Sequence, residues 1–154
     1  YGIVGRADIQ ATVERIYQIK GRSPDKSPII LISDPADMFD TYSPATLEML
    51  QSCWPGPNSI ILPIRNGPTW ITRGIETIAY RLPAHEPLQE LLRSVGPLAA
   101  PSANPESSPP AMTIDQAKEY FGDAVDYYHD AGPVVDQAAS SHFRYHDGDL
   151  TRLR

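Results

Sequence analysis

Residues 18–32 read QIKGRSPDKSPIILI, and this stretch joins a predicted helix to a predicted strand. The apolar run Ile29–Ile32 follows a proline and is typical of a short strand buried in a sheet. Between the two elements, Lys20, Arg22 and Lys26 place three cations within seven residues of a chain whose net charge is −6. Positive charge gathered at one junction of an acidic protein needs an explanation, either in local structure or in binding.

Helical and strand patterns alternate on both sides of this stretch. Apolar residues three and four apart predict amphipathic helices, and short apolar runs between turn residues predict strands. We expect helices over 8–20, 44–52, 86–95 and 113–121, strands over 29–32, 59–64, 77–82, 98–100, 125–128, 143–145 and 150–153, a loop or short strand at 70–72, and a loop over 102–112. Several strands follow one another without a helix. The sequence therefore predicts one α/β domain, residues 1–154, with a mixed, twisted, open sheet and flanking helices.

Composition excludes several classes of function. The length of 154 residues fits one domain, and the net charge of −6 argues against a broad nucleic-acid or anionic-membrane surface, although a small anion pocket remains compatible with it. A single cysteine, Cys53, permits neither an intrachain disulfide nor a cysteine zinc site, and it fits a reducing cytoplasm. No apolar run approaches the roughly 20 residues of a membrane span, and no signal peptide is visible.

The cation cluster has two interpretations. Lysine and arginine at the C-terminal end of a helix often interact favourably with the helix dipole or keep a turn solvated. The cluster taken alone favours that structural role. Against it, Lys20, Arg22 and Lys26 flank a Ser-Pro-Asp turn with few neighbouring acids. Arginine offers a planar fork and lysine a point charge to phosphate oxygens, so an acidic protein could bind a polyphosphate here.

Other motifs are weaker when taken alone. Ser102 and Asn104 follow a predicted strand and suit a ligand beyond the end of a sheet, but such residues also dominate ordinary turns. The Trp54–Pro57 stretch indicates an aromatic plug and a rigid turn. The four histidines lack metal-ligand spacing, since His142 and His146 are four apart in a strand-like stretch. No Walker loop or dinucleotide fingerprint is present, so any ATP site is built differently.

Taken together, these motifs resemble the YrdC-type threonylcarbamoyl-AMP synthase family. Order and spacing agree along nearly the whole chain, and the combination is more specific than any one motif. The matching residues are Tyr1-Gly2, Lys20-Gly21-Arg22 with Lys26, Trp54-Pro55-Gly56-Pro57, Ala79-Tyr80-Arg81-Leu82-Pro83-Ala84-His85, Pro101-Ser102-Ala103-Asn104, Ser140-Ser141 and Leu153-Arg154. The resemblance implies a YrdC-like twisted sheet around a large concave cavity lined by cations.

The resemblance also implies a reaction. Family members condense L-threonine, bicarbonate or CO2, and ATP to L-threonylcarbamoyl-AMP and release pyrophosphate, with Mg²⁺ expected on the triphosphate. Transfer proteins then place the threonylcarbamoyl group on adenosine 37 of tRNA, in the cytoplasm and without a membrane. No nucleophilic side chain and no protein-bound metal are expected. By matching position, the implied site residues are Lys20, Arg22 and Lys26 for charge stabilisation, Arg22, Lys26, Thr77, Ser102, Asn104 and Arg154 for ATP, and Arg81 and Ser140 for threonine.

The chain departs from the family pattern at several positions. The usual S-x-N-x-S-G continues after Asn104 with Pro105, Glu106 and Ser107, and this puts a negative charge near the anion site. Ser141 occupies a position where the family usually has threonine. The chain opens at Tyr1 without methionine, so we expect the family's first strand, first helix and a threonine-contacting Thr to precede it.

Three alternatives stay open. A paralogue that binds nucleotide without turnover is suggested by the departures after Asn104. An RNA-binding module of the same fold would use the basic site without chemistry. A carbamoyl-adenylate-forming domain of the hydrogenase-maturation or O-carbamoyltransferase type would carry out related chemistry.

Overall fold

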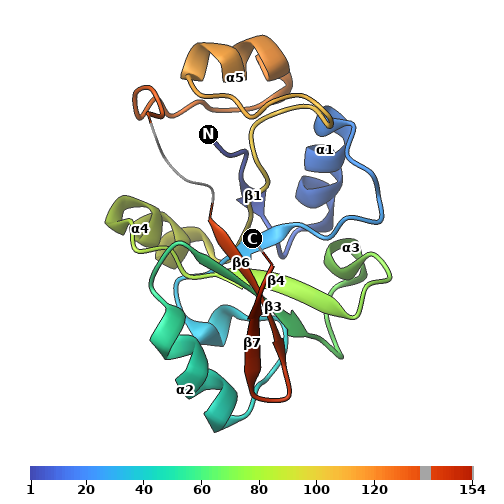
Figure 1. Ribbon diagram of the computed structural model, residues 1–154. Coiled ribbons are helices and arrows are strands. Elements are labelled where there is room, and N and C mark those ends of the chain that lie inside the picture. Colours follow the sequence, from blue (N-terminus) through green and yellow to red (C-terminus); the bar gives the residue numbers. More distant parts are fainter. Residues whose placement is uncertain (136–139, 154) are drawn as a thin grey trace.

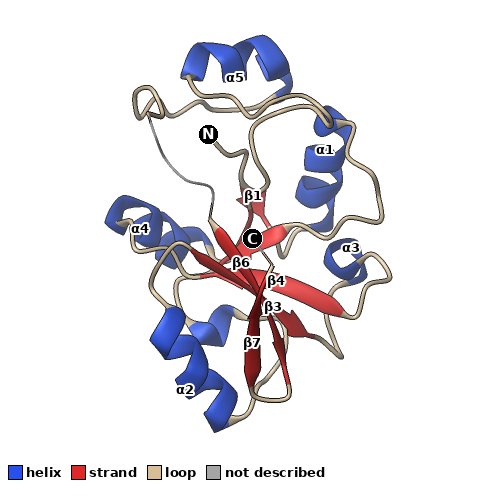
Figure 2. Cartoon of the chain, viewed as in Figure 1, coloured by secondary structure: helices blue, strands red, loops and turns tan. Residues whose placement is uncertain are grey.

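The computed structural model describes residues 1–135 and 140–153, and it contains one mixed sheet flanked by helices (Figures 1 and 2). The strands are β1 Gly5–Arg6, β2 Ile29–Leu31, β3 Asn58–Pro63, β4 Thr77–Arg81, β5 Leu98–Ala99, β6 Ser141–His146 and β7 Asp149–Arg152. The helices are α1 Gln10–Lys20, α2 Pro44–Cys53, α3 Thr69–Thr72, α4 Glu86–Val95 and α5 Ile114–Phe121, with 3-10 turns η1 Pro35–Asp37 and η2 Gly122–Ala124.

The sheet has the strand order β1-β5-β2-β4-β3-β6-β7. Its β2–β4 and β3–β6 pairs are parallel and its other pairs are antiparallel, which confirms the predicted mixed α/β sheet. Figure 1 shows α1 and α5 at one end of the molecule, near the N-terminus, and α2 at the other end. None of the helices in the described residues is both long and apolar enough to cross a membrane.

The central strand β4 separates a buried face from a more open one. Ile78 and Tyr80 have no exposed surface, whereas Thr77, Ala79 and Arg81 alternate with them and keep partial exposure. This alternation follows from the two-residue period of a strand. The buried face joins the main core, which also contains Val13, Ile30, Ile32, Leu50, Ile60, Leu62 and Ile71. One face of β4 therefore lies in the main core, and the other keeps partial exposure beside a smaller core that contains Leu31, Leu92 and Leu98.

Tyr80 brings one polar group into this core. Its hydroxyl oxygen accepts a hydrogen bond from the backbone N–H of Phe39 at 3.0 Å. Burial raises the pKa of the Tyr80 phenol to about 12. The ring therefore fills the interior as a neutral group, and its oxygen satisfies a backbone donor of the segment after η1.

Two segments differ from the sequence-based expectation. Residues 69–72 form helix α3 rather than a loop or strand, because Ile71 is fully buried and the Trp70 indole donates to the Ala7 carbonyl at 3.0 Å. Residues 125–128 are not a strand. Arg15 donates to the Asp126 carboxylate at 2.8 and 3.1 Å and so ties this segment to α1 rather than to the sheet.

The other predicted elements are confirmed, with ends that agree to within two residues. Strand β1, with only two residues, was not expected. Two of the helices begin with a side-chain cap. The Ser43 hydroxyl accepts from the Thr46 backbone N–H at 3.2 Å at the start of α2, and Thr113 accepts from the Gln116 N–H at 3.2 Å at the start of α5.

Replacing Ser43 by alanine should lower the free energy of unfolding by about 1 kcal/mol, because the Thr46 N–H loses its capping oxygen. Chemical denaturation of the wild type and of Ser43→Ala measures this difference. Ser94→Ala, at an exposed position in the last turn of α4, removes the same hydroxyl without removing an N-terminal cap and should change stability by less than about 0.5 kcal/mol. Equal effects of the two substitutions would contradict the capping role.

Candidate functional site

The loop between α1 and β2 carries the three cations singled out by the sequence. Helix α1 ends at Lys20, and Gly21 takes a left-handed conformation with φ of 58°. The Gly21 N–H donates to the Gln18 carbonyl and the Arg22 N–H donates to the Tyr17 carbonyl, at 3.1 and 3.0 Å. Glycine suits this position because it adopts positive φ without a steric penalty. The helix end therefore turns the chain sharply and fixes where Arg22 begins.

Lys20 joins this loop to the loop that follows β5. Its side chain is buried, and its ammonium donates to the Ser102 carbonyl at 2.5 Å and also to the Asn104 carbonyl. In the opposite direction, the Glu106 N–H donates to the Lys20 carbonyl at 2.7 Å. Burial, together with the nearby charge of Arg22, lowers the pKa of Lys20 to about 8, while Glu106 opposes that change. One lysine thus holds the two candidate motifs against each other.

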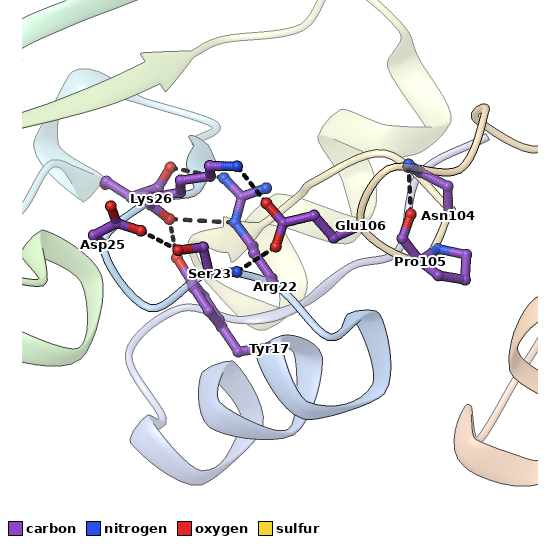
Figure 3. A network of polar contacts seen from close by, with 9 residues as sticks. Tyr17, Arg22, Ser23, Asp25, Lys26, Asn104, Pro105 and Glu106 are labelled. Carbon is purple, nitrogen blue, oxygen red and sulfur yellow. Dashed lines mark hydrogen bonds and ion pairs between the residues drawn. The ribbon is translucent and has the colours of Figure 1, made fainter.

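Arg22 and Lys26 lie on the outer part of this loop (Figure 3). The Arg22 guanidinium donates to the carbonyls of Lys26 and Ser27, both at 3.2 Å, and lies 5.6 Å from the centre of the Tyr17 ring. The Tyr17 hydroxyl also donates to the Lys26 carbonyl. These contacts hold the turn closed and fix the Arg22 guanidinium against the backbone of Lys26 and Ser27.

Glu106 is the acidic partner of this cluster. Its carboxylate accepts hydrogen bonds from the Lys26 ammonium and from the Ser23 backbone N–H (Figure 3). The hydrogen bond from Lys26, followed by the one from Ser23 and the charges of Lys26 and Arg22, holds the pKa of the Glu106 carboxyl below its usual range. The expectation of few neighbouring acids is wrong here, because an acid 80 residues further along the chain reaches the cluster. The contact is attractive, which the sequence alone did not indicate.

Ser102 and Asn104 organise the second loop. The Ser102 hydroxyl donates to the Asn104 side-chain oxygen at 2.5 Å, and the Asn104 amide donates to the Ser108 and Pro105 carbonyls at 2.7 and 3.0 Å. Ser107 adopts a left-handed conformation with φ of 70°. Glycine, which the family pattern has at this position, takes that conformation without strain. Ser107 therefore holds a backbone conformation that glycine would adopt more easily.

Sheet register places Thr77 at the same edge as the cation loop. Ile29 of β2 pairs with Ala79 of the parallel strand β4, so the starts of both strands lie at one edge. The antiparallel strand β5 ends at this edge as well, since the Ala100 N–H donates to the Ile29 carbonyl at 2.9 Å. The sheet thus brings the starts of β2 and β4 and the end of β5 together, although no contact joins Thr77 to the cations directly.

Arg81 and Ser140 are associated with a different feature, the Trp54–Pro57 turn. The Arg81 guanidinium donates to the Gly56 carbonyl at 3.1 Å, and burial lowers its pKa. Ser140 precedes Ser141, whose N–H donates to the Pro57 carbonyl at 3.1 Å. The turn itself is anchored by the Trp54 indole, which is buried and donates to the Asn58 carbonyl at 2.8 Å, and this confirms its predicted structural role.

Sequence reasoning missed Ser59, which lies next to Arg81 in the sheet. Ile60 pairs with Tyr80, and continuing this antiparallel register by one residue puts Ser59 beside Arg81 on the same face. The Ser59 hydroxyl is fully buried and has no hydrogen-bond partner in the described part of the chain. Nothing in the surrounding sequence distinguishes this serine from any other strand serine, so only the register identifies it.

The remaining candidates and cavities add little. Arg154 lies outside the described residues. Within residues 1–135 and 140–153, no group of three or more histidine, cysteine, aspartate or glutamate residues could hold a metal ion. Two open surface depressions, of about 690 and 460 Å³, lie beside α3 and beside η1, and neither is lined by a candidate site residue.

Comparison with known proteins matches this arrangement to one family. The Sua5/YciO/YrdC family model, described as "Telomere recombination", matches residues 1–154. The threonylcarbamoyl-AMP synthase of Pseudomonas fluorescens strain Pf-5 is 37% identical over 122 residues, which cover 76% of this chain and 65% of that protein. This chain therefore corresponds to slightly less than two thirds of that relative's length.

Solved structures agree with the family match. The crystal structure of P. abyssi Sua5 complexed with L-threonine superposes with a TM-score of 0.87 at 31% identity, covering 100% of this chain and 47% of that chain. Full-length HypF in the phosphate- and nucleotide-bound form gives a TM-score of 0.83 at 17% identity, covering 99% of this chain and 25% of that chain, and shows a shared fold alone. With its whole length matched by the family model, the chain belongs to the Sua5/YciO/YrdC family.

Proposed function

We propose that this chain forms L-threonylcarbamoyl-AMP from L-threonine, bicarbonate or CO2, and ATP, with release of pyrophosphate. The observation that carries the proposal is the meeting of the cation loop, held by Lys20, with the Ser102–Asn104 loop at the edge where β4 begins. The P. fluorescens relative is a threonylcarbamoyl-AMP synthase and the P. abyssi relative was solved with L-threonine, which supports the same activity here.

The ATP side of the site is assigned to this edge of the sheet. Arg22 and Lys26 would neutralise the triphosphate, because a guanidinium fork and an ammonium both form charge-assisted bonds to phosphate oxygens. Thr77, Ser102 and Asn104 would add neutral contacts from the neighbouring strand and loop. Arg154 is assigned to ATP by its motif position. Lys20, whose ammonium is directed at two carbonyls, would contribute positive potential while it positions both loops.

The threonine side of the site is assigned to the Trp54–Pro57 turn. Arg81 would hold the substrate carboxylate with its planar fork, and Ser140 would contact the rest of the amino acid.

The reaction needs no nucleophilic side chain. The threonine amine attacks the carbon of CO2, a C–N bond forms and a proton is lost, which gives a carbamate. A carbamate oxygen then attacks the α-phosphorus of ATP, and pyrophosphate leaves with the electron pair of the broken P–O bond. The protein contributes positioning and neutralisation of charge on the phosphates, and a concave, cation-lined cavity would keep water away from the carbamate.

Magnesium would enter with the triphosphate rather than with the protein. The described residues hold no cluster of acidic or histidine ligands that fits a resident metal ion. Mg²⁺ usually keeps several waters and binds through substrate phosphates in such sites. The steps assigned above to side chains therefore do not depend on a metal held by this chain.

The product, a reactive mixed anhydride, implies a partner that uses it. A tRNA threonylcarbamoyl transferase would move the threonylcarbamoyl group to adenosine 37, so tRNA would be an indirect partner. The protein would then be a nucleotide-binding transferase in tRNA modification, and it would act in the cytoplasm.

One second candidate has a specific observation behind it. Because Glu106 already pairs with Lys26, the chain could bind nucleotide without turning it over. Pyrophosphate release from the full chain with ATP and bicarbonate, with and without L-threonine, separates the two. Threonine-dependent release supports the synthase, and ATP binding without release supports the inactive paralogue. A carbamoyl-adenylate-forming domain would instead release pyrophosphate with carbamoyl phosphate, and an RNA-binding module would bind RNA in a salt-dependent manner without ATP turnover.

Replacing Arg22 by alanine should weaken ATP binding by about 1.5–3 kcal/mol, because one charge-assisted contact is removed. Titration calorimetry measures the change, with circular dichroism to check the fold. Arg93→Ala, at an exposed ion pair on α4, removes the same group away from the site and should leave ATP affinity unchanged. If Arg22→Ala binds ATP as the wild type does, the guanidinium is not part of the nucleotide site.

Replacing Arg81 by lysine should abolish most L-threonine binding while much of the ATP binding remains, because lysine lacks the two parallel donors that match a carboxylate. Separate titrations with L-threonine and with ATP measure the two affinities. Arg65→Lys, at an exposed position after β3, is the matched control. Parallel losses of both affinities in Arg81→Lys would show that Arg81 supports the fold or the nucleotide site instead.

A further inference from the structure

Glu106 occupies donors that an anionic ligand would also use. One carboxylate oxygen accepts from the Ser23 backbone N–H at 2.5 Å, and the other accepts from the Lys26 ammonium. Arg22 adds its charge nearby and helps to lower the pKa of Glu106. A backbone N–H and an ammonium that donate to one carboxylate, with the charge of a guanidinium nearby, resemble the donor sets that bind phosphate oxygens.

The position of Glu106 is built into the loop. Its N–H donates to the Lys20 carbonyl at 2.7 Å, and the following turn is closed by the Ser108 N–H, which donates to the Pro105 carbonyl at 3.1 Å. Ser107 takes the left-handed conformation within that turn. The backbone around Glu106 is therefore fixed from both sides, and it directs the side chain toward the cation loop (Figure 3).

The contact is weak enough to be reversed. The Lys26 side chain is 55% exposed and that of Glu106 is 28% exposed, so water and salt screen their attraction. Exposed ion pairs of this kind contribute little to stability. A ligand that carries several negative charges gains more from these two donors and from the nearby charge of Arg22 than a single carboxylate does.

We propose that Glu106 is an internal anion that occupies the phosphate position of the cation loop and competes with the ligand for it, so that this residue sets the anion affinity of the site. The inference rests on the proposed function only in assigning phosphate to this loop. A polyphosphate displaces the carboxylate, and a singly charged anion does not. The measured affinity for polyphosphate is then reduced by the fraction of molecules in which Glu106 holds the site.

The test uses inorganic tripolyphosphate, which contains neither nucleoside nor amino acid, so it does not depend on synthase activity. Glu106→Gln keeps the shape of the side chain and removes its charge. Glu106→Ser also shortens the side chain, so that it no longer extends to the cation loop. Calorimetry should show tripolyphosphate binding on the order of tenfold tighter in both variants than in the wild type, equivalent to about 1.4 kcal/mol. The backbone amide signal of Ser23 in ¹⁵N–¹H spectra should shift in both variants and, in the wild type, on addition of tripolyphosphate.

Two controls make the test specific. Glu48→Gln, on the exposed face of α2, changes net charge by the same amount and should leave the affinity within about twofold of wild type. When Lys26 is already replaced by Met, Glu106→Gln should increase the affinity for tripolyphosphate by no more than about twofold, because the two residues act on the same site. Equal affinities of wild type and both Glu106 variants, an equal gain in Glu48→Gln, or no measurable tripolyphosphate binding in any variant would overturn the proposal. Threonine-dependent pyrophosphate release, assayed separately, reports on the proposed function alone.

Discussion

The buried ammonium of Lys20 is the interaction on which the arrangement of the site depends. The ammonium is removed from water at the end of α1. In place of water it donates hydrogen bonds to the Ser102 and Asn104 carbonyls, which lie more than 80 residues away in sequence. A buried charge without partners would cost several kcal/mol, so the two loops cannot separate without exposing or orphaning it. The lowered pKa of Lys20 reflects that desolvation. The Lys20 contacts therefore join three segments into one unit: helix α1, the cation loop and the loop that carries Ser102 and Asn104.

The sheet supplies the second constraint. Parallel pairing of β2 with β4 and antiparallel pairing with β5 bring two strand starts and one strand end to a common edge. Residues that are scattered over more than 75 positions of the sequence thereby reach one region, with Thr77 at the start of the central strand. The opposite end of β4 carries Arg81, which is tied to the Trp54–Pro57 turn. Two groups of candidate residues are thus held by one strand.

Much of this could be predicted from local sequence, and the limits of that prediction have physical causes. Caps such as Ser43 and Thr113 and the apolar run Ile29–Leu31 act over a few residues, so local patterns locate them. The short helix at 69–72 was missed because the burial of Ile71, not a helical period, stabilises it. The partnership of Glu106 with Lys26 and the position of Ser59 beside Arg81 depend on tertiary contacts and on sheet register, which no local pattern encodes.

The open face of β4 also limits how this protein can change during evolution. Thr77 and Arg81 are four residues apart, so they share a face and their Cα atoms are separated by roughly 13 Å at about 3.3 Å per residue. An insertion or deletion of one residue between them would rotate one of the two side chains into the core, where Ile78 and Tyr80 now lie. The number of residues between Thr77 and Arg81 is therefore constrained by the core. The spacing between the two candidate residues at the ends of this strand is accordingly fixed by backbone geometry.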